Sequence, residues 1–138
     1  SKYRGTGVTA PNFAYDLCVK GTTPAQREGL DLSSWAGAWN GAEPILADVL
    51  DRFSEVFEPY GFRPTTHLPS YGMAETTLCV TASRLDRLPV IVHFRGSALE
   101  QNRVEPCAAD EVSAVRLVGS GIAGGGLEVA IVDPATLR

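Results

Sequence analysis

A segment with helical periodicity in the middle of the chain constrains the fold most strongly. Apolar side chains recur there at every third or fourth position, with charged side chains between them. This period is typical of a helix with one buried face and one face in water. The apolar positions are Ile45, Leu46, Val49, Leu50, Phe53, Val56 and Phe57. We therefore expect a helix over 45–57, which Pro59 and Gly61 would end.

Short apolar runs on both sides of this helix predict strands. The runs are 35–39, 78–81, 90–94, 114–118 and 127–132. Further helices are expected over 11–19 and 23–28, whereas residues 5–9 have the composition of a loop. This order predicts an α/β fold, in which a mostly parallel sheet flanked by helices passes into a more antiparallel, β-rich portion.

The two helices near the start of the chain carry specific expectations. Phe13 and Leu17 should face the core from the helix over 11–19, with Tyr15 as a further candidate. Thr23 should cap the short helix over 23–28, and Pro24 suits its first turn because it has no N–H to leave unpaired.

The composition is that of an ordinary globular protein with one domain. The 138 residues are 44% hydrophobic and 20% charged, which argues against a disordered chain. The net charge of −4, without a run of Lys or Arg, argues against nucleic-acid binding. No apolar run is long enough for a membrane span, and the first residues lack the pattern of a secretory signal. We therefore expect a cytoplasmic location.

The cysteines and histidines predict no metal site and no disulfide framework. Cys18, Cys79 and Cys107 are odd in number and lack a CxxC spacing, so buried free thiols are expected. His67 and His93 are isolated from other ligand-type residues and are expected to be structural. His67 also lies close enough to a strand end to contact a site there.

The turn Asn40-Gly41-Ala42-Glu43-Pro44 is a first candidate binding segment. It connects the end of a predicted strand to the start of the central helix, where ligands bind in open α/β sheets. Gly41 and Ala42 leave the backbone uncovered, so a flat ring could lie against it. The alternative is a strand-to-helix turn without a ligand.

Residues 71–77 form a second candidate binding segment, Tyr71-Gly72-Met73-Ala74-Glu75-Thr76-Thr77. An aromatic ring here and bare backbone in the first segment could hold a base between them. Glu75 is a hard oxygen ligand of the type that holds Mg²⁺ beside phosphates. The alternative is a polar turn with a solvated Glu75.

Residues 119–124 match the dinucleotide fingerprint G-x-G-x-x-G. The residues that follow alternate like a strand, however, and the fingerprint requires a helix there. We therefore reject a nicotinamide-cofactor site and expect a glycine-rich hairpin or bulge.

Three segments together resemble a known family. They are residues 10–18 (APNFAYDLC), residues 32–44 (LSSWAGAWNGAEP) and residues 70–77 (SYGMAETT). In this order they resemble the adenylate-forming enzymes, and most closely the fatty acyl-AMP ligases. The resemblance implies an ATP-dependent ligase and the fold of part of its N-terminal domain. Residues 128–133 are similar to the strand that follows in that family.

The resemblance also implies a role for each matching residue. Asn40, Gly41, Ala42 and Glu43 would line the adenine pocket, and Tyr71 would pack on the ring, within a segment that also contributes Gly72, Met73, Ala74 and Thr76. Glu75 would be catalytic through Mg²⁺ beside the ATP phosphates. Asn12 and Phe13 would lie near the fatty-acid tunnel. Ala74 stands where the wider superfamily usually has threonine, which leaves the phosphate contact to Thr76, Thr77 or the backbone.

Residues 84–115 are longer than the equivalent stretch of acyl-CoA synthetases, and fatty acyl-AMP ligases carry an insertion here. The insertion is thought to restrain the mobile C-terminal domain. Leu88, Val90, Val92 and Phe94 alternate, so one apolar face of the inserted strand could dock on the body. A phosphate loop with its lysine and a lysine-bearing C-terminal domain do not occur in residues 1–138, which we expect to be a single incomplete domain.

The implied activity of the whole enzyme is to activate a fatty acid with ATP and Mg²⁺, which releases pyrophosphate. The acyl group of the acyl-adenylate would pass to an acyl carrier protein of a polyketide or peptide synthase. The 138 residues alone should be inactive without the remainder of the enzyme. Two alternatives stay open: a long-chain fatty acyl-CoA ligase, and a catalytically inactive fragment or interaction domain.

Overall fold

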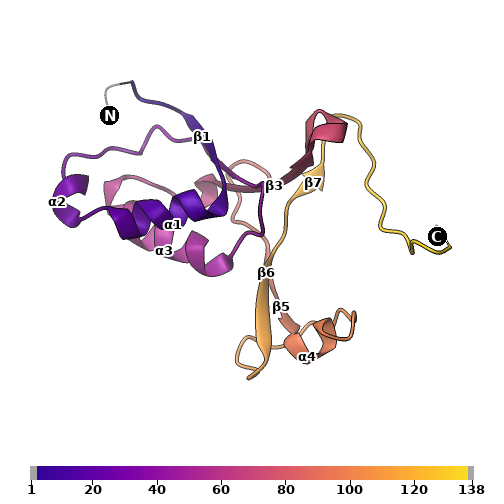
Figure 1. Ribbon diagram of the computed structural model, residues 1–138. Helices are drawn as coiled ribbons and strands as arrows, with labels where there is room; N and C mark the ends of the chain where they lie inside the picture. Colours follow the sequence, from indigo (N-terminus) through magenta and orange to yellow (C-terminus); the bar gives the residue numbers. More distant parts are fainter. Residues whose placement is uncertain (1–2, 137–138) are drawn as a thin grey trace.

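The computed structural model describes residues 3–136, in which the helices and strands form a mixed sheet with flanking helices (Figure 1). The main helices are α1 (Asn12–Gly21) and α3 (Ala47–Phe57), with the short helices α2 (Pro24–Arg27) and α4 (Gly96–Leu99). Short 3-10 helices are η1 (Glu58–Tyr60), η2 (Pro64–Thr66) and η3 (Ala74–Thr76). The strands are β1 (Gly7–Ala10), β2 (Gly37–Asn40), β3 (His67–Met73), β4 (Leu78–Ala82), β5 (Ile91–Arg95), β6 (Ala114–Val118) and β7 (Ile122–Ala123).

The main sheet has the strand order β1-β2-β3-β4-β7. Strands β1, β2 and β3 run parallel, whereas β4 and β7 are antiparallel to their neighbours. The expected change from a parallel to a more antiparallel region is therefore confirmed. Strand β1 was expected to be loop. It has four residues and pairs on one side only, with β2, so its sequence carries little of the pattern of a buried strand.

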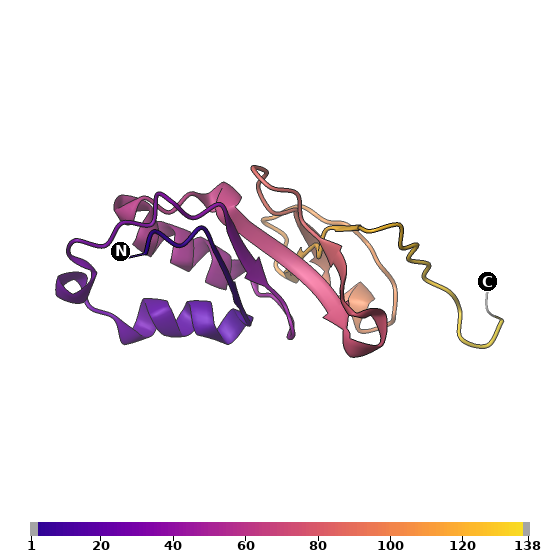
Figure 2. The ribbon, with the colours of Figure 1, turned by 90° about the horizontal axis from the view of Figure 1, so that it is seen from above.

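The core lies between the parallel strands and the pair of helices α1 and α3, which lie side by side in Figures 1 and 2. Phe53 of α3 is 2% exposed and lies at the centre of an aromatic cluster. Its ring meets those of Tyr15 and Phe62 edge-on, with centroid distances of 5.2 and 4.9 Å. The Tyr15 hydroxyl donates to the carbonyl of Trp39 at 2.9 Å, which ties α1 to β2.

Helix α3 buries the face that its periodicity predicts, including Val49, Leu50 and Phe57. It begins only at Ala47, because Leu46 has an extended backbone and is 57% exposed. Gly61 follows η1 with φ of +90°, a left-handed conformation that glycine adopts without strain. The central helix and its end are therefore confirmed, with a start two residues later than expected.

Helix α1 is confirmed, but the face expected to be buried is wrong. Phe13 and Leu17 are each 61% exposed, whereas Tyr15 is 3% exposed. Phe13 and Leu17 lie on one side of the helix, four residues apart, and Tyr15 and Asn12 point to the core. The tyrosine hydroxyl and the asparagine amide both find hydrogen-bond partners inside, which lets these residues be buried. Helix α2 has the expected Thr23 cap, in a capping box with Gln26.

The expected strand over 127–132 and the hairpin over 119–124 are wrong. Residues 127–132 form no strand, and Ile131 is 94% exposed. Instead, Ile122 and Ala123 form β7 and pair with β4. Gly121 makes this pairing possible, since a Cβ at its position would lie 1.9 Å from the Ala82 carbonyl carbon. Alternation alone does not make a strand when no neighbouring strand offers a partner.

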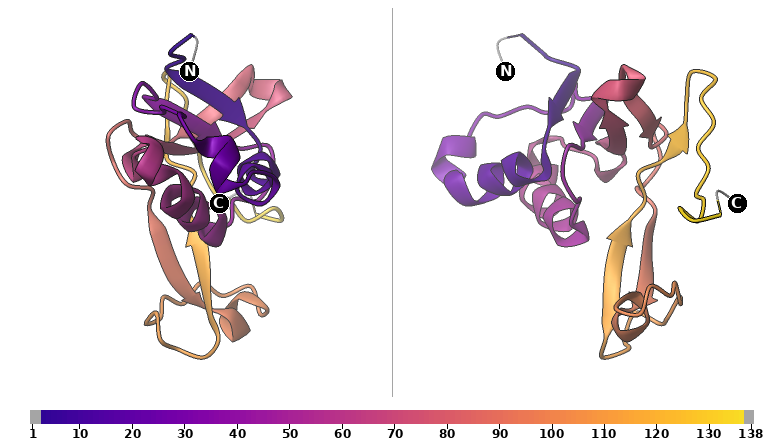
Figure 3. Two further views of the ribbon diagram at one scale, coloured as in Figure 1. Left: turned by 90° about the vertical axis from the view of Figure 1, so that its left-hand side faces the viewer. Right: turned by 45° about the vertical axis from the view of Figure 1, so that its right-hand side comes forward.

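Strands β5 and β6 form a separate two-stranded ribbon that projects away from the main sheet (Figure 3). Arg116 of β6 forms ion pairs with Asp48 and Asp51 of α3 at 2.9 and 2.7 Å, which connect the ribbon to this helix. Leu88 and Val90 are each 65% exposed, and the alternating apolar face is largely open among the described residues.

The expected burial of the cysteines is wrong, although all three are free. Cys18 and Cys79 are exposed and Cys107 is partly exposed. Within residues 3–136, no helix combines the length and apolar character that a membrane span requires.

His67 belongs to the core, as a structural histidine would. It is 1% exposed, and its Nε2 lies 3.2 Å from the Leu50 carbonyl and 3.0 Å from the Ser54 hydroxyl. Nδ1 has no hydrogen-bond partner within the described part of the chain. Burial lowers the pKa of His67 from 6.5 to about 4, so the ring is neutral at pH 7.

Truncation of Phe53 should destabilise the protein strongly. Phe53→Ala would leave a cavity among Tyr15, Phe57 and Phe62, and we expect the free energy of unfolding to fall by about 3–5 kcal/mol. Glu55→Ala, at an exposed position of the same helix, is the control and should change it by less than about 0.5 kcal/mol. Urea denaturation of the full-length protein measures both. Equal effects of the two substitutions would contradict the central position of Phe53.

Acid should destabilise the protein in part through His67. The unfolded state binds a proton below the ordinary pKa of 6.5, whereas the folded state binds it only near pH 4. The contribution of neutral His67 to the free energy of unfolding is therefore fully present above pH 6.5. It is lost as the pH falls toward 4, which lowers the free energy of unfolding by roughly 3 kcal/mol. In His67→Gln this part of the decrease should vanish. The measurement is the free energy of unfolding of both proteins across this pH range, and parallel curves would exclude the assignment.

Candidate functional site

The carboxyl ends of β2 and β3 lie side by side and form the framework of the candidate site. The two strands are parallel, and Asn40, the last residue of β2, pairs with Pro69 of β3. The loop after β2 (residues 41–46) therefore runs beside Tyr71 and Gly72 of β3. The two segments singled out in the sequence are brought together, as the order of the elements predicts.

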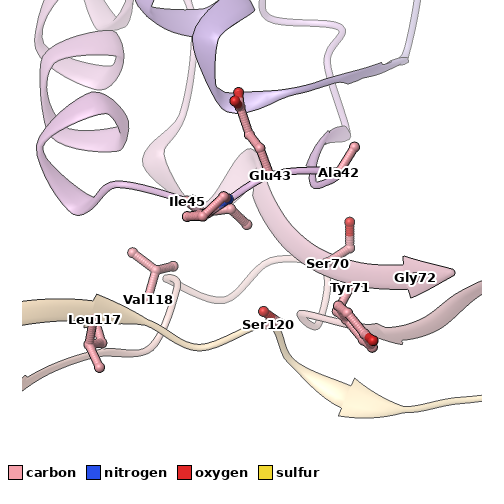
Figure 4. Close-up of a pocket in the computed structure, with 10 residues that line it drawn as sticks. Ala42, Glu43, Ile45, Ser70, Tyr71, Gly72, Leu117, Val118 and Ser120 are labelled. Carbon is pink, nitrogen blue, oxygen red and sulfur yellow. The ribbon is translucent and has the colours of Figure 1, made fainter. Parts of the chain in front are cut away.

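Two cavities share the residues where these segments meet, which are Ala42, Ser70, Tyr71 and Gly72. The first cavity, of about 490 Å³, is shown in Figure 4. Residues 42–45 form one wall of it, and Leu117, Val118 and Ser120 form the opposite wall. The second cavity, of about 470 Å³, is more apolar and is lined by Thr9, Ala10, Pro11, Trp39, Gly41, Leu78 and Cys79 in addition to the shared residues.

Gly41 and Ala42 have little or no side chain, so the start of the loop leaves its backbone uncovered where the two cavities meet; Gly41 lines the second cavity and Ala42 lines both. Gly41 approaches β3 closely, since a Cβ there would lie 2.9 Å from the Ser70 carbonyl oxygen. Ser70 also donates from its hydroxyl to the carbonyl of Asn40 at 3.1 Å. Ala42 has φ of +68°, a left-handed conformation that is strained for a residue with a side chain. The loop is thus held in a shape that an isolated turn would not prefer.

Tyr71 presents a half-exposed ring to both cavities. The strand is irregular at this point, with a shift of register between Tyr71 and Gly72. Gly72 is required there, because a Cβ would lie 1.8 Å from the Leu78 carbonyl oxygen. The chain then turns through η3 and returns as β4, with Thr77 and Leu78 both at positive φ. This tight return brings Leu78 into the wall of the second cavity.

Asn40, Asn12 and Glu43 connect the loop to helix α1 and do not offer their side chains to the cavities. Asn40 is fully buried and donates from Nδ2 to Oδ1 of Asn12 at 3.3 Å. Glu43 turns its carboxylate toward the start of α1, where Oε1 accepts from the backbone N–H of Phe13 at 2.6 Å (Figure 4). Phe13 is exposed, next to Pro11 of the second cavity.

Residues 73–77, which follow Gly72, lie outside the walls of both cavities. Met73, Ala74 and Glu75 are exposed, and Thr76 donates its hydroxyl hydrogen to the Met73 carbonyl at 3.1 Å. Among the described residues, no cluster of three or more metal-ligating side chains occurs. A single exposed carboxylate such as Glu75 still fits one ligand position of Mg²⁺, which typically combines one or two carboxylates with phosphates and water.

Several cavity-lining residues were not singled out in the sequence. Trp39, Leu78 and Cys79 line the second cavity, and Leu117, Val118 and Ser120 line the first. Leu78 and Cys79 were predicted to start a strand, and Cys79 also to be a buried free thiol. The tight turn after Gly72 leaves no periodic pattern in the sequence that would place them in a cavity wall. His67, in contrast, lines neither cavity.

Known proteins have similar sequences over the length of this chain, although no protein-family model matches it. It is 44% identical over 140 residues to a medium-chain-fatty-acid–[acyl-carrier-protein] ligase of Moorena producens, an alignment covering 100% of this chain and 24% of the relative. It is 38% identical over 133 residues to a long-chain-fatty-acid–AMP ligase of Mycobacterium marinum, covering 96% of this chain and 21% of the relative. The chain thus spans less than a quarter of the length of these relatives.

Solved structures agree with the sequence comparison. The fatty acyl-adenylate ligase of L. pneumophila, in complex with acyl adenylate and pyrophosphate, superposes with a TM-score of 0.90 at 40% identity, over 98% of this chain and 23% of that one. A structure of the fatty acid AMP ligase from Legionella pneumophila gives a TM-score of 0.92 at 38% identity over the same shares. An adenylation domain of a keto acid-selecting peptide-synthetase module gives 0.75 at 25% identity, over 87% of this chain and 23% of that one. The expected fold, part of the N-terminal domain of adenylate-forming enzymes, is confirmed, and over nearly its whole length the chain is similar to one segment of the fatty acyl-AMP ligases.

Proposed function

We propose that the full-length protein activates a fatty acid with ATP and forms an acyl-adenylate and pyrophosphate. The observation that carries this proposal is the pair of cavities that meet at Ala42 and Tyr71. One has a wall of bare backbone beside an aromatic ring, and the other is largely apolar. An acyl-adenylate has the same division, because a purine nucleotide is joined through a phosphate to a hydrocarbon chain.

The adenine would occupy the first cavity. The backbone of Ala42 and Glu43 would offer a flat surface, next to Gly41, and the Tyr71 ring can pack on a purine in an offset stack. Asn40 and Gly72 would support this wall from the ends of β2 and β3. Supporting contacts with the phosphates would come from Thr76, Thr77 or backbone N–H groups beside Met73 and Ala74.

The acyl chain would occupy the second cavity, because apolar surface is removed from water there. Trp39, Leu78 and Pro11 are among the apolar residues of its wall. Phe13 lies at the start of α1 beside Pro11 and would extend this surface outward. Phe13 and Leu17, exposed on one side of α1, favour a further apolar contact along the helix.

Glu75 would hold Mg²⁺ beside the phosphates, next to the first cavity. The ion would neutralise phosphate charge during the displacement of pyrophosphate. The contribution of this chain is one carboxylate at the end of β3, and the remaining ligands would be phosphate oxygens and water.

The acceptor of the acyl group would be an acyl carrier protein in the cytoplasm. Support comes from the relative of Moorena producens, whose name specifies a fatty-acid–[acyl-carrier-protein] ligase. Residues 84–115, which include β5 and α4, would be the insertion typical of the family, within a domain that is completed by other parts of the enzyme. Within this insertion, Arg95 forms ion pairs with Glu105 and Glu111 at 2.8 and 2.7 Å, which would keep the insertion folded beside the site.

Replacement of Glu75 should abolish most of the adenylation activity. In the full-length protein, we expect Glu75→Gln to lower fatty-acid-dependent exchange of pyrophosphate into ATP by about 100-fold or more, because phosphate charge is left uncompensated. Glu128→Gln, at an exposed position outside both cavities, is the matched control and should retain the exchange. Unchanged exchange in Glu75→Gln would remove Glu75 from the mechanism.

The choice of acceptor can be tested with the same protein. We expect faster thioester formation with a carrier protein that bears its phosphopantetheine thiol than with free coenzyme A, and none with the unmodified carrier. Radiolabelled fatty acid and gel or chromatographic separation measure all three. Rapid formation of acyl-CoA would favour a fatty acyl-CoA ligase instead.

A further inference from the structure

We infer that Asn12 is a positioning residue for the nucleotide: it holds the loop of residues 41–46 that forms a wall of the first cavity. This inference rests on the proposed function, because it assumes that a nucleotide binds in this cavity. Asn12 then acts through the loop and not by touching the ligand.

One oxygen atom of Asn12 holds both ends of the loop. Asn12 is 5% exposed, and its Oδ1 accepts from Nδ2 of Asn40 and from the backbone N–H of Leu46, each at 3.3 Å. Asn40 ends β2 and Leu46 precedes α3, so these two residues bracket the loop. The distance between the ends of the loop is therefore set from helix α1.

A second link ties the middle of the loop to the same helix end. Pro11 precedes α1 and offers no side-chain cap, so the first N–H groups of the helix need partners from elsewhere. Glu43 supplies one, since its Oε1 accepts from Phe13 N at 2.6 Å, and a carboxylate is favoured at the positive end of a helix. Figure 4 shows the carboxylate turned away from the cavity and toward this helix end.

The loop needs such external support because its own conformation is unfavourable. Ala42 is left-handed, and Gly41 is pressed against the Ser70 carbonyl. Asn40 has an Oδ1 without a hydrogen-bond partner among the described residues, so its amide depends on the bond from Nδ2 to Asn12. Loss of the Asn12 acceptor would leave two donors unpaired in or near the interior. Relaxation of the loop would then be the simplest way to rehydrate them.

The position of Asn12 also predicts which ligand should bind more weakly when Asn12 is replaced. The loop contributes four consecutive residues, 42–45, to the first cavity, whereas Asn12 lines neither cavity. The second cavity takes only Gly41 and Ala42 from the loop. Its other walls include Thr9 and Ala10 of β1, Trp39 of β2, and Leu78 and Cys79 of β4, and the Asn12 side chain forms its hydrogen bonds with Asn40 and Leu46 instead. We therefore expect an effect on nucleotide binding that exceeds the effect on fatty-acid binding.

The test compares Asn12→Leu with Asn12→Asp in the full-length protein. Leucine has nearly the same branched shape but no acceptor, whereas aspartate retains an acceptor for both donors. We expect Asn12→Leu to weaken ATP binding by about tenfold, in equilibrium dialysis with ATP alone, and Asn12→Asp to recover most of this loss. In the exchange assay, the KM for ATP should rise in Asn12→Leu while the KM for fatty acid changes by less than about twofold.

A second pair of variants keeps the inference testable if Asn12→Leu does not fold. Glu43→Ala removes the other link at an exposed position, and Glu43→Gln retains an acceptor for the Phe13 N–H. Glu43→Ala should weaken ATP binding by several-fold and Glu43→Gln by less. Equal ATP binding in Glu43→Ala and the unsubstituted protein, or an Asn12→Asp variant as impaired as Asn12→Leu, would overturn the inference. Absence of ATP binding by the unsubstituted protein would instead overturn the proposed function.

Discussion

The structure depends on the parallel pairing of β2 with β3. Parallel neighbours end at the same edge of a sheet, so the loop after β2 and the residues after Ser70 must share that edge. Helices α1 and α3 make this pairing stable, because the aromatic cluster around Phe53 covers the parallel strands. The two cavities are a consequence of that arrangement, since each forms where the strand ends leave the core.

Several backbone positions along this edge are strained or tightly packed. Ala42, Thr77 and Leu78 are at positive φ, and Gly41 and Gly72 are packed so closely that any Cβ would clash. Each feature is unfavourable for an isolated turn and persists only because neighbouring elements hold it. The start of α1 supports the loop of residues 41–46, because Asn12 accepts from Asn40 and the Phe13 N–H donates to the Glu43 carboxylate. One helix end thus serves both the stability of the core and the shape of the candidate site.

The sequence predicts an element correctly where its buried residues recur with the period of a helix or strand. Helix α3 follows from its apolar face, and the meeting of Ala42 with Tyr71 follows from the order of strands and helices. The exposed faces of α1 could not be predicted, because Tyr15 and Asn12 are buried through hydrogen bonds that only the tertiary structure provides. Residues 127–132 alternate like a strand, but no strand within residues 3–136 pairs with them. Leu78 reaches the second cavity through the tight turn after Gly72, which has no periodic pattern in the sequence.

The central claim is that a purine lies between the backbone of residues 41–43 and the ring of Tyr71. A crystal structure of the full-length protein with a bound, non-hydrolysable acyl-adenylate analogue tests it most directly. We expect density for the adenine ring in the first cavity and for the acyl chain in the second. Adenine density at any site without Ala42 and Tyr71 would contradict the account.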